Sequence, residues 1–215
     1  MDNRRQRASP NLRALVAVAE PTNLSTYGLP PIDVSGEVAW IRANLGDIPT
    51  VVLPAPCSGE RATLATIERT LRDAVSICWL VGAVSMRNSE SCLWLEQPDG
   101  VAVPVSARVL ATHLARIPLV VLSPPGSVPM VPGHHAITRL ARDLAQGGIP
   151  AVLTLPSALG ETDAAPCAAT FFATLRDGGR VNDALRAARA SETQHAAPGT
   201  LALFHREADG HSGHG

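Results

Sequence analysis

The sequence predicts a three-layer α/β domain with a mainly parallel central sheet, helices on both faces and an inserted β-hairpin. Three observations support this fold class. Apolar runs without polar alternation, above all Leu119 to Leu122, are typical of strands buried on both faces of a parallel sheet. Segments with helical spacing separate these runs, as parallel strands require. The 215 residues, 46% of them apolar, suit one domain with a full core.

The first half of the domain alternates apolar strand segments with amphipathic helical segments. Val38, Ile41 and Leu45 repeat at helical spacing, and Gly46 follows them as a helix stop. In chain order we expect a strand over 12–19, a helix over 34–45, a strand over 50–53, a helix over 60–72 and a strand over 75–81.

The alternation breaks between residues 91 and 104, where two short apolar runs flank the turn sequence Gln97-Pro-Asp-Gly100. Proline and glycine at these places are typical of a β-hairpin turn. Ser106 then has the character of a helix N-cap, and the helix after it should turn Val109, Leu110 and Leu114 inward. We therefore predict a hairpin over about 91–104 and a helix over 106–113.

The second half returns to strands and helices, and its central strand over 117–122 ends at the pair Pro124-Pro125, because proline cannot donate to a sheet ladder. Gly147-Gly148 provide a helix end where positive φ costs little. We expect a helix over 133–146, a strand over 149–155, helices over 163–176 and 181–193, and a strand over 200–205. Around this single domain, 12–206, we expect a flexible N-terminus over 1–11 and a disordered tail over 207–215.

Composition excludes several function classes. The net charge is −1, and no basic patch interleaves with aromatic residues, so we expect no nucleic-acid partner. The chain has no lysine, which excludes a P-loop, and it has no Gly-x-Gly-x-x-Gly string, so we expect no nucleotide or other cofactor. No apolar run approaches the ~18 residues that a membrane helix needs, and the start lacks a signal-peptide core. We therefore expect a cytoplasmic protein with no membrane partner.

The cysteines and histidines do not have the spacing of a metal site. Cys78, Cys92 and Cys167 fit strands or a helix as buried thiols, whereas Cys57 stands in a loop-like stretch. His134 and His135 are adjacent on a helix, so they point apart and cannot chelate one ion. Ser123 and Ser127 lack the Gly-x-Ser-x-Gly elbow of a serine hydrolase. We expect no metal.

The order of several local strings resembles the CHAT family, which comprises caspase-like cysteine peptidases of bacteria that are often attached to repeat domains or to defence systems. The resemblance covers about 12–206. Its strings are Leu12-Arg-Ala-Leu-Val-Ala-Val-Ala-Glu-Pro21, Leu29-Pro-Pro31, Ala62-Thr63, the strand ending at Gly82, Leu119-Val-Val-Leu-Ser123, Gly148-Ile-Pro-Ala-Val152, Phe171-Phe172, Leu175, Gly178 and Val181 to Arg189. The resemblance implies a caspase-like fold.

The resemblance also implies two catalytic positions, and both are degenerate in this chain. A His-Phe-Ala-Gly-His-Gly type string is implied where the chain has Trp79-Leu-Val-Gly-Ala-Val84, so Ala83 stands in place of the base. Ser-Ala-Cys is implied where the chain has Ser123-Pro-Pro, so Pro125 stands in place of the nucleophile. Both should lie side by side at a surface crevice, where restoring histidine and cysteine would cost within ~2 kcal/mol. The neighbouring crevice residues would be Trp79, Gly82, Ser123, Pro124 and Ser127.

Two functions remain open on this basis. The first is a catalytically inactive domain that acts as a protein-interaction or regulatory module, with a component encoded in the same operon or an active relative as its protein partner. The second is a peptidase or hydrolase with a relocated nucleophile such as Cys57. Trp94, in the hairpin, is the aromatic candidate for an interface anchor, and packing beneath the hairpin is its structural alternative.

Overall fold

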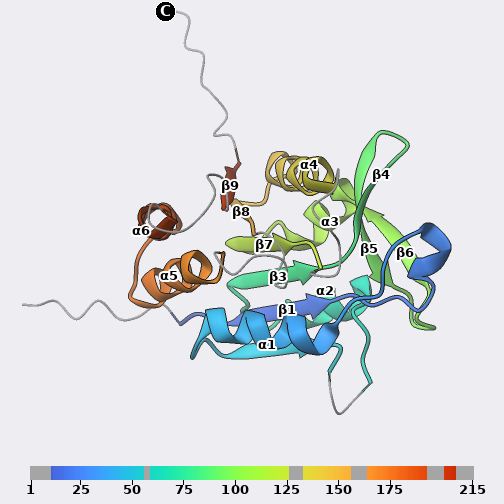
Figure 1. Cartoon of the computed structure of the whole chain (residues 1–215), viewed down its shortest axis with the longest axis horizontal. Coiled ribbons are helices and arrows are strands. Elements are labelled where there is room, and N and C mark those ends of the chain that lie inside the picture. Colours follow the sequence, from blue (N-terminus) through green and yellow to red (C-terminus); the bar gives the residue numbers. More distant parts are fainter. Residues whose placement is uncertain (1–10, 56–58, 126–132, 156–163, 193–200, 207–215) are drawn as a thin grey trace, which may run out of the picture.

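The computed structural model describes residues 11–55, 59–125, 133–155, 164–192 and 201–206 (Figure 1). At its centre is a six-stranded sheet with the order β2-β1-β3-β7-β8-β9. Neighbouring strands from β2 to β8 are parallel, and β9 joins β8 in the antiparallel direction. The strands are β1 (Ala14–Val18), β2 (Thr50–Leu53), β3 (Ile77–Val81), β7 (Leu119–Ser123), β8 (Ala151–Thr154) and β9 (Ala202–His205). The predicted mainly parallel sheet is confirmed, and β1, β3, β7 and β8 lie next to one another in it.

Helices cover both faces of this sheet, as predicted. Alternate strand residues point to opposite faces, so Leu80 and Val120 join one apolar cluster while Trp79 and Val121 join the other. The first face is covered by α2 (Leu64–Thr70), α3 (Ala107–Leu114) and α4 (Gly133–Gln146). The second is covered by α1 (Val34–Leu45), α5 (Ala164–Arg176) and α6 (Val181–Glu192).

A second, three-stranded antiparallel sheet lies at the right end of the molecule in Figure 1. Its β5 (Glu90–Glu96) and β6 (Ala102–Ser106) form the predicted hairpin. The third strand, β4 (Val84–Arg87), was not predicted, because a segment of four residues is too short to show the alternation of a strand. Since β4 follows β3 directly, this small sheet lies beyond the carboxyl ends of the central strands.

Three details of the helices differ from the predictions. The helix expected over 60–72 is shorter, because Thr63 caps it by accepting the Thr66 amide at 3.0 Å and is itself held by a parallel bridge to Glu96. On α3, Val109 is 39% exposed, so its predicted inward position is wrong, whereas Leu110 and Leu114 are buried. Ser106 does precede α3, but its side chain makes no capping hydrogen bond.

The short 3-10 helix η1 (Leu24–Tyr27) lies in the connection from β1 to α1. Within the residues that the structure describes, none of the helices is both long and apolar enough to cross a membrane.

Candidate functional site

The positions at which the family resemblance implies a catalytic pair lie beyond two neighbouring strands. Parallel pairing of β3 with β7 aligns Val81 with Ser123, the last residue of each strand. Ala83 and Pro125 each follow two residues later. Extending the register therefore brings both to the carboxyl edge of the central sheet, where open α/β sheets usually hold their ligands.

This edge is covered rather than open at Ala83. Ala83 is only 4% exposed and packs in a small apolar cluster with Trp94 and Ala102, against which Leu29 also lies. Its carbonyl accepts the Trp94 amide at 2.9 Å. Pro125 is also buried. The surface crevice expected at these positions is absent around Ala83, because the small sheet and the chain before α1 fill the space.

Gly82, expected beside the crevice, is instead packed closely against β5. A Cβ atom built on Gly82 would meet the Trp94 carbonyl oxygen at 3.0 Å and Leu93 Cδ1 at 3.1 Å. The carbonyl belongs to a paired strand and cannot move freely. Glycine at this position therefore lets the end of β3 approach β5.

Trp79 and Ser123 form a buried pair instead of lining a crevice. Trp79 Nε1 donates to Ser123 Oγ at 2.9 Å, and the two residues are 0% and 2% exposed. The indole stacks on Phe172, with ring centroids 5.2 Å apart, and meets Trp40 edge-on. Ser123 thus satisfies an indole N–H inside the core. Pro124 is partly buried after it, and Ser127 lies outside the described residues.

Replacing the acceptor in this pair should destabilise the fold. We expect Ser123→Ala to lower the free energy of unfolding by about 1 to 3 kcal/mol, because the indole N–H stays buried without a partner. Urea titration measures the change. Ser85→Ala is the matched control, since Ser85 Oγ accepts Trp94 Nε1 at the same 2.9 Å but is itself partly exposed. Equal losses in the two variants would contradict the role of burial at Ser123.

The described cysteines are buried, as predicted for Cys78, Cys92 and Cys167. Burial raises the pKa of the Cys78 thiol to about 12, and burial also raises the pKa of Cys92. A thiol with a raised pKa carries little thiolate at neutral pH and is a poor nucleophile. Cys57, the candidate relocated nucleophile, lies outside the described residues.

The raised pKa gives a testable pH dependence. At pH 8 we expect iodoacetamide to modify Cys78 at least ~100-fold more slowly in the folded protein than in urea, because folding suppresses the thiolate and excludes the reagent. Above the ordinary thiol pKa of about 8.5, the unfolded chain loses this proton while the folded chain keeps it, so stability should fall as pH rises. Peptide-resolved mass spectrometry measures the labelling. Equal rates in both states would contradict the buried thiol.

The described histidine side chains lie away from this edge. His205 pairs with Ala151, the first residue of β8, and its Nε2 lies 2.8 Å from Asn182 Oδ1. His113, near the end of α3, lies 3.4 Å from Glu68 Oε2. Both are therefore nearer the amino ends of the parallel strands. The described residues include no group of three or more potential ligands that could hold a metal ion, and the side chains of His134 and His135 are not described.

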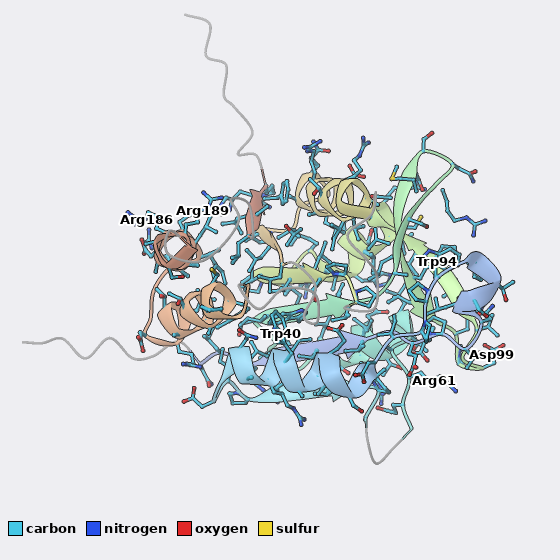
Figure 2. The ribbon with its side chains drawn as sticks, in the orientation of Figure 1. Trp40, Arg61, Trp94, Asp99, Arg186 and Arg189 are labelled. Atoms are coloured by element: carbon cyan, nitrogen blue, oxygen red, sulfur yellow. The ribbon has the colours of Figure 1, made fainter. Side chains whose placement is uncertain are left out.

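Trp94 does not act as an exposed anchor. It is 3% exposed, its ring centroid lies 4.4 Å from that of Tyr27, and the Arg87 guanidinium lies 5.5 Å from the same centroid. Figure 2 shows Trp94 beside η1, at the end of the molecule that holds the small sheet. The alternative of packing beneath the hairpin is confirmed.

A charged network near the end of β1 was not found from the sequence. Glu96 is 3% exposed; its Oε2 accepts Arg61 Nη1 at 2.9 Å, and its Oε1 accepts the Glu20 amide at 3.3 Å. Burial, together with Glu96 and Asp33, raises the pKa of Glu20. Nothing in the spacing of these residues marks them as partners, because three separate segments bring them together. Beside them is a cavity of about 440 Å³.

Comparison with known proteins settles the family. The model of the CHAT domain matches residues 1–202. The chain belongs to the CHAT domain family. The predicted resemblance is thereby confirmed, and the mixed α/β architecture with its mostly parallel sheet is consistent with a caspase-like fold.

Other comparisons add little. Two matching structures are pyridoxal kinases in complex with ADP. The Bacillus subtilis enzyme is 12% identical, over 83% of this chain and 89% of that one, with a TM-score of 0.36. The Staphylococcus aureus enzyme is 9% identical, over 90% and 99%, with a TM-score of 0.37. These scores are too low to support an inference for this CHAT domain. Comparison with curated proteins gave no match.

Proposed function

We propose that this CHAT domain is catalytically inactive and acts through protein contacts as a regulatory module, within a bacterial defence or signalling system. The observation that carries the proposal is the identity and burial of Ala83, which stands where the family resemblance implies the histidine base. Pro125 stands where the same resemblance implies the cysteine.

The chemistry of these residues supports inactivity. An alanine methyl group cannot accept a proton, and proline has no thiolate to attack a carbonyl. Removing one member of a nucleophile and base pair lowers the rate by ~10⁴ to 10⁶ in well-studied triads. Here both positions have changed, while the sheet and helices that would hold them are intact.

The surroundings support it further. Of the described thiols, Cys78 is a core residue with a raised pKa, and the described histidines His113 and His205 lie toward the opposite end of the strands. These groups offer no second pair of thiolate and imidazole at the carboxyl edge. A domain that keeps its fold without this chemistry can still bind a protein, either an active relative or a component encoded in the same operon.

Labelling with a thiol-reactive peptide probe tests inactivity. We expect slow, unsaturable labelling and no peptide cleavage. The Cys57→Ala variant should give the same cleavage result and the same slow, unsaturable labelling. Saturable labelling of one cysteine, linked to cleavage and lost in Cys57→Ala, would overturn the proposal in favour of a hydrolase with a relocated nucleophile.

The regulatory role has its own test. Proteins encoded beside this gene, and an active CHAT peptidase from the same genome, are mixed with the purified domain and followed by calorimetry and by peptidase rate. We expect at least one to bind with a Kd below ~10 μM, the range of specific but reversible complexes. Absence of binding and of any rate change across this set would contradict the module.

A further inference from the structure

The segment Pro21–Leu29, which we call the strap, crosses from the end of β1 onto the small sheet. It contains η1 and passes over the edge where Ala83 lies. Leu29 packs against the cluster of Ala83, Trp94 and Ala102, and the Tyr27 ring lies against Trp94. The strap is thus part of what keeps Ala83 buried.

A few contacts hold the strap to the small sheet. Gly100 O accepts the amide and the hydroxyl of Thr22 at 2.9 and 3.1 Å. Asn23 Oδ1 accepts the Ala102 amide at 2.7 Å. These bonds join the strap to β6 and to the turn before it, not to the central sheet.

Two strap residues, Pro21 and Leu24, are buried, and Leu24 packs in the apolar cluster on the sheet face that α1 covers. The rest of the strap has little stability of its own. Its helix is a single 3-10 turn, and Asn23, the residue at the N-cap position, makes no side-chain capping bond because its oxygen is used on Ala102. Most of its outer residues are exposed, with Tyr27 at 45%. Part of the strap, together with Glu20, Pro31 and Arg61, also lines the cavity of about 440 Å³, so the strap is not packed on every side.

We propose that the strap is a hinged cover that detaches from the small sheet while the central sheet stays folded. Its release uncovers Ala83 and Trp94 at the carboxyl edge, so the strap controls access to this part of the domain. Leu24 is the strap's contact with the cluster on the α1 face, and the side-chain hydrogen bonds to the small sheet are only partly buried. Segments with few buried apolar contacts open below the free energy of global unfolding. The proposal concerns the motion of the strap and holds whether or not the domain is inactive.

The test uses a reporter thiol beneath the strap. In Ala83→Cys, iodoacetamide labels the new thiol whenever the strap opens, and Cys78 in the same molecule reports global unfolding. Peptide-resolved mass spectrometry follows both. With the strap intact, we expect the thiol at position 83 to react ~100-fold more slowly than the thiol in Met86→Cys, whose native side chain is 47% exposed, but much faster than Cys78.

Loosening the strap should change one rate only. Asn23→Ala removes the bond to Ala102 and should raise labelling at position 83 about tenfold while leaving Cys78 unchanged. Thr26→Ala is the matched control, because Thr26 is an exposed residue of the same η1 turn and no side-chain bond is lost. Equal rises at position 83 and at Cys78 would show that the cover opens only with the whole fold and would overturn the proposal.

Hydrogen exchange tests the same motion without an engineered thiol. In the wild-type protein, we expect the Thr22 and Ala102 amides, which form the strap contacts, to exchange at least ~10-fold faster than amides of β3 and β7. If the Thr22 and Ala102 amides exchange as slowly as the amides of β3 and β7, the hinged cover is overturned. This result does not depend on whether Ala83→Cys folds.

Discussion

Restoring the implied base should destabilise this domain strongly. We expect Ala83→His to lower the free energy of unfolding by about 2 to 6 kcal/mol. An imidazole added at a site that is 4% exposed must displace Trp94 or Leu29, and overpacking of this kind costs about 1 to 3 kcal/mol. A buried ring nitrogen without a partner adds about 1 to 3 kcal/mol. Urea unfolding followed by circular dichroism measures the sum.

The control for this variant is Met86→His, which places the same ring on β4, where the native side chain is 47% exposed. We expect it to cost less than about 0.5 kcal/mol, as is usual for surface substitutions. If Ala83→His is as stable as Met86→His, the burial of the implied base position is wrong. The double variant Ala83→His with Pro125→Cys should not cleave peptides while position 83 stays covered. A base must lie within hydrogen-bond reach of the proton that it removes.

The sequence predicted the central sheet well because its strands follow a simple rule. Val120, Val121 and Leu122 are apolar in succession, and a strand buried on both faces needs that pattern. Helix α1 was predicted with the observed bounds from the helical spacing of its apolar residues and from Gly46 after its end. The structure adds the cap at its start, where Asp33 accepts the Gly36 amide.

The covered edge could not be predicted in the same way. Ala83 is buried by Leu29, Trp94 and Ala102, which come from three different segments, and no local pattern links them. The sequence suggested that a residue just after a strand would be near a crevice. That expectation fails here because β4 continues directly from β3 and draws β5 over the end of the strand.

The hydrogen bond of Trp79 shows the same limit. Apolar neighbours on both sides predict that Trp79 is in a strand, and the structure confirms it. Its Nε1 partner, Ser123, is 44 residues away, and the pairing depends on the register of β3 with β7. The sequence alone made Ser123 a candidate for chemistry at the strand end, whereas the register makes it the acceptor that a buried indole requires.

Removing the partner of Glu96 should have the second large effect. We expect Arg61→Met to lower the free energy of unfolding by about 3 kcal/mol, because the Glu96 carboxylate, 3% exposed, is left buried without its guanidinium. This loss of about 3 kcal/mol is at the low end of what is typical when one partner of a buried ion pair is removed. The Arg61 side chain is 38% exposed, so water can partly replace it.

The matched control for this prediction is Arg69→Met, which breaks the pair between Arg69 and Glu60. The separation there is 2.6 Å, shorter than the 2.9 Å of Arg61 and Glu96, but the two side chains are 58% and 40% exposed. Exposed pairs contribute about 0 to 1 kcal/mol, so burial and not distance should decide the order of the two losses. Replacing both partners, in Arg61→Met with Glu96→Met, should recover much of the lost stability, because no charge then stays buried. Equal losses in the two single variants, or no recovery in the double variant, would mean that Glu96 reaches solvent and does not depend on Arg61.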